Sequence, residues 1–293
     1  MSIDYTERGF EENIEFELIS SGYIERKLTG DSLDEFKQHA IDTEVFLQFL
    51  EITQPKQLER LKRAYKENYK QKVIQRLSKE LSNRGTIDCL RHGIKDYGVK
   101  LTLAYNKPVS TMNRTLWDQY EQNIFTVSRQ VYYSKKNSNS IDVLLSLNGL
   151  PIVVMELKNH LTGQTVDNAK LQFVKDRDPN ELLFQFKKRA LVYFAVDPDE
   201  VYMTTRLNKD KTFFLPFNKG HKEGKGNPPN PFGHKSSYLW EEVFTRESLA
   251  NIIQHFVRFD GAPSDPLKKR TLFFPRYHQL DVVRQLINHA RNN

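Results

Sequence analysis

The chain has very little cysteine and no long apolar run. Cys89 is the only cysteine among its 293 residues, which excludes an internal disulfide and any zinc site with several cysteine ligands. No stretch of about 18 consecutive apolar residues is present, so no membrane-spanning helix is expected. A reducing compartment such as the cytoplasm is therefore the simplest expectation.

Targeting and common catalytic signals are also missing. The N-terminal sequence MSIDYTERGFEENIEF lacks the basic and then apolar order of a secretory signal. The eight histidines show no spacing typical of metal ligands, and no Ser-His-Asp arrangement stands out. What the chain does carry is a net charge of +7 and a pI of about 9.2. Such a charge is typical of proteins that bind polyanions, but it is not specific to them.

The first part of the chain, residues 1–85, has the periodicity of helices. Apolar residues recur at i, i+4 and i+8 from Phe10 and predict a helix over residues 9–20. A second helical region is expected over residues 31–51. Residues 56–84 predict one long helix rich in Lys and Arg, whose basic face either meets solvent or contacts phosphates.

From about residue 86 the pattern changes to strands rich in Val, Leu, Ile, Thr and aromatic residues. Strands are predicted at 99–105, 125–134, 141–147 and 151–157. A helix over 179–194, a further strand after it and a closing helix over 247–259 complete the pattern.

The segment IDVLLSLNGLPIVVMELKNH, residues 141–160, joins two of these strands through Asn-Gly, a strong hairpin signal. Both faces of PIVVMEL are apolar, so the sheet is expected to be covered on both sides. The charged residues Asp142, Glu156 and Lys158 lie near the ends of the segment. Glu156 and Lys158 point the same way, because residues i and i+2 of a strand share a face.

These three residue types suit a metal site. Two converging carboxylates, Asp142 and Glu156, supply the hard oxygen ligands that Mg²⁺ prefers, and the carbonyl of Leu157 is a further candidate ligand. The metal polarises a phosphate and lowers the pKa of a bound water, while Lys158 orients that water or stabilises developing charge. Ordinary strand ends facing solvent are the alternative. A second Glu-x-Lys at 223–225 lies in a Gly- and Pro-rich loop and lacks the strand context.

The hairpin must satisfy a parity condition for this metal site to form. A plain two-residue Asn-Gly turn pairs Asp142 with Met155 and puts Asp142 and Glu156 on opposite faces. The two acids share a face only if the loop has an odd number of residues or one strand carries a bulge. The metal-site hypothesis therefore predicts one of these two geometries.

The hairpin resembles the PD-(D/E)xK nuclease motif. The surrounding sequence resembles one family that carries it, the N-terminal endonuclease region of the restriction (R, motor) subunit of type I restriction-modification enzymes. The resemblance covers most of residues 10–260 and rests on the stretches FEENIEFELISSGY, LRHGIKDYGVKLTLAYNKP, NIFTVSRQVYYS, SIDVLLSLNGLPIVVMELKN, TGQTVDNAKLQF, DRDPNELLFQFKKRALVYFAVD, VYMTTRL, FFLPFNKG and YLWEEVF.

The resemblance implies an α/β (α+β) fold, with helices flanking a mixed central β-sheet. It implies that Asp142 and Glu156 bind Mg²⁺ and that Lys158 is the catalytic lysine. Related nucleases often place an acid of the first helix near the metal. In FEENIE we favour Glu11 among Glu11, Glu12 and Glu15, with a solvent-exposed helix face as the alternative.

The end of the chain resembles another element of the same enzymes. FFPRYHQLDVVRQL, residues 273–286, is similar to the segment that opens the motor domain of superfamily 2 helicases, in which a Gln recognises the adenine of ATP. That role falls on Gln279; a terminal amphipathic helix is the alternative. We therefore expect a helical region (1–85) packed on a nuclease core (86–260), followed by a linker and motor opening (261–293). No ATP hydrolysis is expected from residues 1–293 alone.

One departure and several further candidates complete the prediction. Many relatives carry Gln-xxx-Tyr on the helix after Glu-x-Lys, but here Gln185 is followed four residues later by Arg189. Candidate DNA contacts are Gln130 on a predicted strand and the basic run Lys187, Lys188 and Arg189. The alternative for Gln130 is packing at the edge of the sheet, and the alternative for the basic run is a helix face exposed to solvent.

The function implied by the resemblance is Mg²⁺-dependent cleavage of double-stranded DNA in the cytoplasm of a bacterium or archaeon. The full-length enzyme would use ATP for translocation and would work with methylation and specificity subunits. Two alternatives remain: an autonomous repair or recombination nuclease of the same fold, and a non-catalytic module that binds DNA or docks another subunit.

Overall fold

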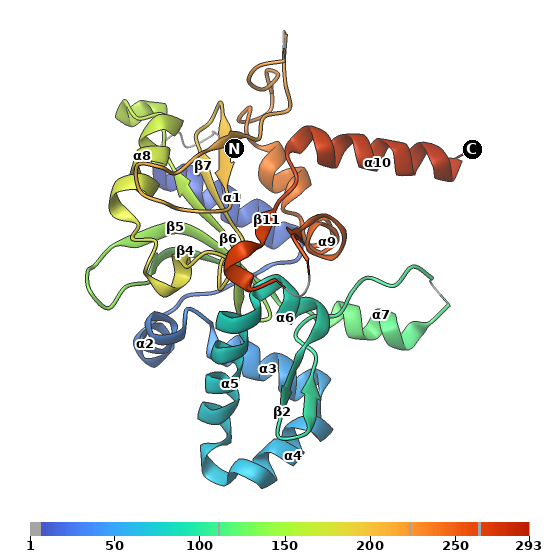
Figure 1. The fold of residues 1–293 in the computed structure, drawn as a ribbon. Helices are drawn as coiled ribbons and strands as arrows, with labels where there is room; N and C mark the ends of the chain where they lie inside the picture. Colours follow the sequence, from blue (N-terminus) through green and yellow to red (C-terminus); the bar gives the residue numbers. More distant parts are fainter. Residues whose placement is uncertain (1–6, 111, 223, 263–264, 293) are drawn as a thin grey trace.

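A seven-stranded mixed sheet forms the centre of the computed structural model, which describes residues 7–110, 112–222, 224–262 and 265–292. Its strands, in spatial order, are β1 (Ile24–Glu25), β4 (Phe125–Tyr132), β5 (Ser140–Leu147), β6 (Leu150–Leu157), β7 (Val192–Val196), β8 (Val201–Thr204) and β9 (Leu215–Pro216). The pairs β1–β4 and β6–β7 are parallel, and the remaining neighbours are antiparallel. The predicted mixed sheet is confirmed (Figure 1).

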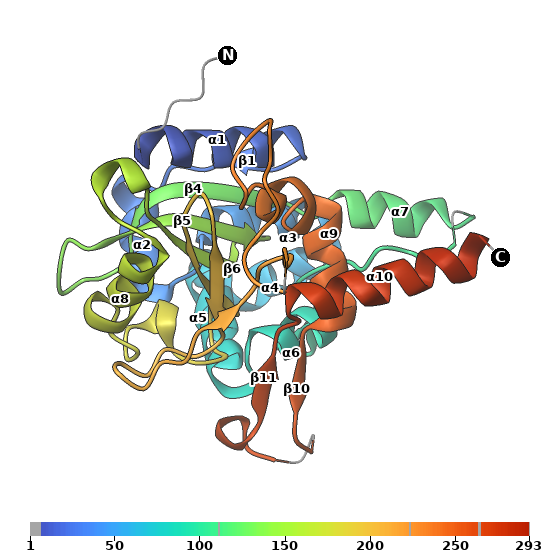
Figure 2. The same ribbon diagram turned by 90° about the horizontal axis from the view of Figure 1, so that it is seen from above.

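Helices surround this sheet (Figures 1 and 2). They are α1 (Glu7–Ser20), α2 (Gly30–His39), α3 (Thr43–Thr53), α4 (Pro55–Tyr65), α5 (Tyr69–Arg84), α6 (Thr86–His92), α7 (Arg114–Glu121), α8 (Val166–Asp176), α9 (Arg246–Asn251) and α10 (Tyr277–Asn292). Two small antiparallel ribbons lie outside the main sheet: β2 (Ile94–Asp96) with β3 (Val99–Leu101), and β10 (Arg258–Asp260) with β11 (Thr271–Phe273). The strand predicted at 99–105 is therefore shorter and outside the main sheet.

Buried apolar side chains form two clusters, one on each face of the sheet. In the larger cluster, alternate strand residues such as Val143 and Met155 pack against α1 and the helices α3 to α6. In the smaller cluster, the strand residues between them, such as Leu144 and Val154, pack against α2 and Phe173 of α8. Every residue of β6 is buried, which confirms that the sheet is covered on both sides.

The long basic helix predicted over residues 56–84 is wrong in one respect. The chain turns at Lys66, which has a φ of 53°, and α4 and α5 pack against each other as a helical hairpin. Leu58 and Leu61 of α4 and Leu77 of α5 belong to the same core cluster. They reach it together because the chain reverses between the two helices; one straight helix would carry them apart.

The helix predicted over residues 179–194 is also wrong. The segment contains a short 3₁₀ turn (Leu182–Phe184), further turns and then β7. Lys187 has a left-handed φ of 71°, which a continuous helix excludes. The helix that follows the hairpin is instead α8, which was not predicted and which begins with a capping box between Thr165 and Asn168.

The end of the chain returns to the core and then leaves it. The closing helix predicted over 247–259 is shorter, since α9 passes into a π-helical turn (Ile252–Phe256) and then β10. Leu280 of α10 joins the larger core cluster, while the rest of α10 projects from the body on the same side as α7 (Figures 1 and 2). Within the described ranges, no helix has both the length and the apolar character to cross a bilayer.

Candidate active site

The hairpin between β5 and β6 satisfies the parity condition through a bulge. Its turn is the two-residue one, with Leu147 paired to Leu150 and positive φ at both Asn148 and Gly149. The register then shifts: Ser146 pairs with Pro151 but Leu145 pairs with Val153. One extra residue, Ile152, is therefore inserted in β6. Of the two geometries predicted from the sequence, the structure has the bulge.

This bulge aligns the two acids. Val143 pairs with Met155, so continuing the register by one residue sets Asp142 opposite Glu156 on the same face of the sheet. They have the parity of Leu144 and Val154, so they face the side covered by α8. Without the inserted residue, Asp142 would lie opposite Met155, and the two carboxylates would diverge.

The two carboxylates differ in their partners. Asp142 is buried; its Oδ2 accepts a hydrogen bond of 2.7 Å from the backbone N–H of Leu157. Glu156 is fully buried, with 0% of its surface exposed, and its Oε1 accepts a bond of 2.7 Å from Nε of Arg177. Its Oε2 has no hydrogen-bond partner among the described residues. Burial raises the pKa of Glu156 to about 8, and the charge of Asp142 adds to that rise.

Gln130 connects this pair to α1. Its Nε2 donates to Oε1 of Glu11 at 2.8 Å and lies 3.3 Å from Oδ1 of Asp142. The neighbouring pairs of β4 and β5 place Gln130 directly opposite Asp142, and its φ of 49° turns it out of regular strand geometry. Left-handed non-glycine residues cluster at functional sites. Gln130 thus bridges two acids in this structure; its predicted contact with DNA stays a prediction.

Glu11 is the acid of α1 that reaches the network. It is buried, whereas Glu12 is exposed and pairs with Arg8, and Glu15 forms its closest pair, 2.8 Å, with Arg129. Among the described residues, however, no group of three His, Cys, Asp or Glu side chains is arranged to hold a metal ion. Direct metal coordination by Glu11 therefore stays a prediction.

Arg177 is a site residue that no sequence pattern predicted. It follows α8 directly, and its side chain is buried with 2% of its surface exposed. Besides Glu156, it donates from Nη2 to the carbonyl of Ser140 at 2.7 Å and stacks over the ring of Tyr133 at 5.6 Å. Arg177 therefore occupies one oxygen of Glu156 and fixes the carboxylate in place.

These residues fit a divalent cation through a small ligand set. Oε2 of Glu156, which has no hydrogen-bond partner in the described part of the chain, and the carboxylate of Asp142 across the strand pair are the hard oxygen donors that Mg²⁺ prefers. Ligation by the carbonyl of Leu157 stays a prediction. Lys158 follows in the chain and its positive charge acts on Glu156. In the second Glu-x-Lys sequence, Glu223 lies outside the described residues.

The predicted basic run does not form one solvent-facing patch. The guanidinium of Arg189 is fully buried and donates three bonds of 2.7 Å, to the carbonyls of His39 and Lys188 and to Oγ of Ser78. The structure thus contradicts the predicted phosphate contact of Arg189, which instead joins the loop to α2 and α5. Lys188 is half-buried and Lys187 is buried, and both line one cavity that is separate from the carboxylates.

Gln185 does not lie on a helix, since it follows the short 3₁₀ turn. On α8, the helix after Glu-x-Lys, Gln172 is followed four residues later by Asp176, so the Gln-xxx-Tyr pattern is absent there too. The aromatic residue beside the site is Tyr133, which precedes β5 in the chain and contacts Arg177.

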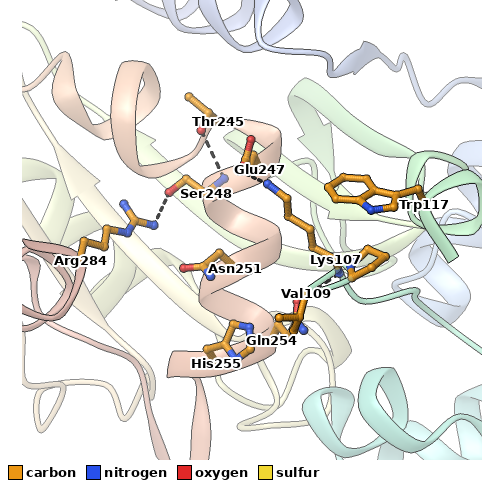
Figure 3. Close-up of a pocket in the computed structure, with 11 residues that line it drawn as sticks. Lys107, Val109, Trp117, Thr245, Glu247, Ser248, Asn251, Gln254, His255 and Arg284 are labelled. Carbon is orange, nitrogen blue, oxygen red and sulfur yellow. Dashed lines mark hydrogen bonds and ion pairs between the residues drawn. The ribbon is translucent and has the colours of Figure 1, made fainter. Parts of the chain in front are cut away.

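Two cavities lie elsewhere. One of about 620 Å³ lies between the loop at Lys107, α9 and α10, where Lys107 pairs with Glu247 and Arg284 donates to Oγ of Ser248 (Figure 3). None of the predicted catalytic residues lines it. The other, of about 490 Å³, is lined by Gln279, whose Oε1 accepts from the backbone N–H of Arg276. Its predicted contact with adenine stays a prediction.

Comparison with known proteins agrees with the resemblance drawn from the sequence. A family model described as the type I restriction enzyme R protein N terminus matches residues 5–212. That range contains α1, the β5–β6 hairpin and α8, and thus every residue of the carboxylate network. No curated protein is similar enough to count as a match.

Proposed function

Because the chain belongs to the family of type I restriction enzyme R protein N termini, we propose that it is the metal-dependent endonuclease region of such a subunit. It would hydrolyse phosphodiester bonds of double-stranded DNA. One observation carries this proposal: the bulge in β6 sets Asp142 opposite Glu156, whose buried Oε2 has no hydrogen-bond partner among the residues that the structure describes. A buried polar atom without a partner is costly, so it favours a ligand.

The residues suited to hold Mg²⁺ are Asp142 and Glu156, with the carbonyl of Leu157 as a third donor. When bound, the ion would polarise the scissile phosphate and lower the pKa of the attacking water. Arg177 occupies Oε1 of Glu156, so Oε2 remains for the metal. Partners that fix a ligating carboxylate orient it and tune metal affinity.

The chain's own side chains supply the rest of the chemistry. Lys158 is near enough to affect the pKa of Glu156, and its ammonium would orient the attacking water or stabilise charge on the phosphate. Gln130 keeps the carboxylate of Asp142 in place and links it to Glu11. In the complete enzyme we expect cleavage to follow ATP-driven translocation, with target choice made by the specificity subunit.

Plasmid cleavage tests the proposal. The R subunit that carries this region is assembled with methylation and specificity subunits, and Glu156→Ala and Lys158→Ala are compared with wild type. We expect each variant to cleave about 10³-fold more slowly while ATP hydrolysis is unchanged. Lys100→Gln, on the exposed side of β3, removes one positive charge away from the hairpin and serves as the matched control.

The same assay separates the alternatives. Cleavage that survives both substitutions with ATP hydrolysis unchanged would mean that the acids are structural, which is the expectation for a DNA-binding or docking module. Cleavage by residues 1–293 alone, without ATP or partner subunits, would instead favour an autonomous nuclease.

A further inference from the structure

A second site is built from cations and aromatic rings rather than from acids. We define the cationic pocket as the cavity of about 610 Å³ lined by Lys187, Lys188, Arg206, Phe186 and the turn at Leu267. It lies between the loop that precedes β7 and the segment that connects β10 to β11. Neither Asp142 nor Glu156 lines it.

Cations and rings alternate through this pocket. The guanidinium of Arg206 lies 5.2 Å from the centre of the Phe186 ring, and Nζ of Lys187 lies 4.3 Å from the centre of the same ring. Nζ of Lys187 is also 6.0 Å from the ring of Phe259, which Arg270 covers at 5.9 Å. Rings stabilise neighbouring cations but do not neutralise them. The pocket itself is lined by three cations, Lys187, Lys188 and Arg206, and by the ring of Phe186, while Phe259 and Arg270 lie behind Lys187 and do not line it.

Lys187 is the buried member of the group. Only 1% of its surface is exposed, and Nζ donates to the carbonyl of Leu267 at 2.6 Å. Burial lowers the pKa of Lys187 to about 8, and the charges of Arg206 and Arg270 lower it further. Within the described part of the chain, no Asp or Glu lines the pocket. A buried ammonium beside two guanidinium groups lacks the counter-charge that buried cations normally have.

Lys187 has a strained, left-handed backbone conformation. Its φ of 71° is left-handed, which is uncommon for a residue other than glycine. Its carbonyl accepts a bond of 2.9 Å from the N–H of Thr86, and a Cβ on Gly85 would lie 3.0 Å from that carbonyl. The start of α6 therefore packs directly against the strained residue. Strain maintained by such close packing is typical of functional positions.

We propose that the cationic pocket binds phosphate groups, with Lys187 and Arg206 as the residues that contact them. A single carboxylate would neutralise only one of the three lining cations, Lys187, Lys188 and Arg206, whereas a nucleic-acid strand or a pyrophosphate presents several negative charges. Guanidinium groups bind phosphate through two parallel hydrogen bonds, and an ammonium adds a point charge. Ser82 and Asn83 add neutral polar groups to the lining. The proposal does not depend on the metal site.

Duplex binding without metal ion is the first test. A labelled duplex is titrated with the 293-residue chain, its Lys187→Met and Arg206→Gln variants, and the charge-matched control Lys100→Gln. At about 0.1 M salt we expect each pocket variant to weaken binding roughly five- to tenfold and to lower the slope of log K against log salt by about 0.9. Arg206 is exposed, so Arg206→Gln keeps the test valid if Lys187→Met does not fold.

Calorimetric titration with pyrophosphate distinguishes the source of the phosphate. Pyrophosphate binding that both pocket variants lose, with duplex binding unchanged, would identify a small phosphate ligand. Loss of duplex affinity in both variants, but not in Lys100→Gln, would identify the nucleic-acid backbone. The proposal is overturned if neither titration distinguishes the pocket variants from the control.

Discussion

The carboxylate site and the cationic pocket each bury a charged group whose bonding is incomplete among the described residues. In the first, Oε2 of Glu156 has no partner among the described residues, and Asp142 faces it with a second negative charge. In the second, the contacts that the described residues make with Nζ of Lys187 are one carbonyl oxygen and two aromatic rings. The pKa of Glu156 is raised and that of Lys187 is lowered, so in both sites burial favours the neutral form of the group. Each site would be stabilised by a ligand of opposite charge.

Arg189 indicates what distinguishes these sites from ordinary buried charges. It lies two residues from Lys187 and is as deeply buried, yet three oxygen atoms at 2.7 Å accept its hydrogen bonds. Its role is to join the loop to neighbouring helices. Burial alone therefore does not identify a ligand site; a buried charge whose bonding is incomplete does.

The largest effect is expected when the ion pair between Glu156 and Arg177 is removed. Arg177→Met leaves Glu156 buried without its cation and raises the pKa of Glu156 further, because Arg177 lowers that pKa. The free energy of unfolding should therefore fall by up to about 3–5 kcal/mol, and the loss should grow as the pH rises above 8, where the wild-type carboxylate ionises beside Arg177 but the variant must stay protonated or bury an unpaired charge. Urea unfolding measures the change. The double variant Arg177→Met with Glu156→Leu should recover most of it, because the carboxylate that Arg177 compensates is then absent as well. A loss below about 1 kcal/mol would show that Arg177 does not compensate Glu156.

A smaller effect concerns the pH dependence set by Glu156. Its pKa rises from 4.5 in the unfolded chain to about 8 in the folded protein, so between these values the folded state binds a proton that the unfolded state has lost. The free energy of unfolding should therefore fall as the pH rises through this range. Glu156→Gln should flatten that slope. An identical slope in the variant would contradict the assigned shift.

The smallest effect is expected from Lys187, with the opposite sign. Its pKa falls from 10.5 to about 8 on folding, so between these values the unfolded state binds the additional proton. The free energy of unfolding should then rise with pH across this interval, as the buried amine loses its unfavourable charge. Lys187→Met should lack the rise, and Lys100→Gln should keep it. If the free energy of unfolding depends on pH in the same way in Lys187→Met and Lys100→Gln, the assigned pKa shift of Lys187 is wrong.

The sequence predicted the part of the carboxylate site that depends on strand parity. Asp142, Glu156 and an alternating apolar pattern were enough to require a bulge or an odd loop, because side chains alternate along a strand. The partner of Glu156 could not be predicted. Arg177 lies 21 residues along the chain, and only the packing of α8 on the sheet brings it to the hairpin.

Residues 179–194 show the opposite limit. Leu183 and Phe184 with the charged residues after them fit a helical period, but Lys187 and Arg189 are buried and anchored to distant elements. Tertiary contacts, which no local pattern records, override helix propensity here. For α8 the local signal was present, since Thr165 caps the helix and Ala169 and Phe173 share its buried face. That helix was predictable and was missed.

Binding of Mn²⁺, an oxygen-preferring substitute for Mg²⁺, tests the central claim most directly. Electron paramagnetic resonance counts free Mn²⁺ in titrations of the wild-type chain, Asp142→Asn, Glu156→Gln and the control Lys100→Gln. The account predicts Mn²⁺ binding by the wild type and the control, weakened at least about tenfold in each carboxylate variant. Equal Mn²⁺ binding by the wild type and both carboxylate variants would contradict it.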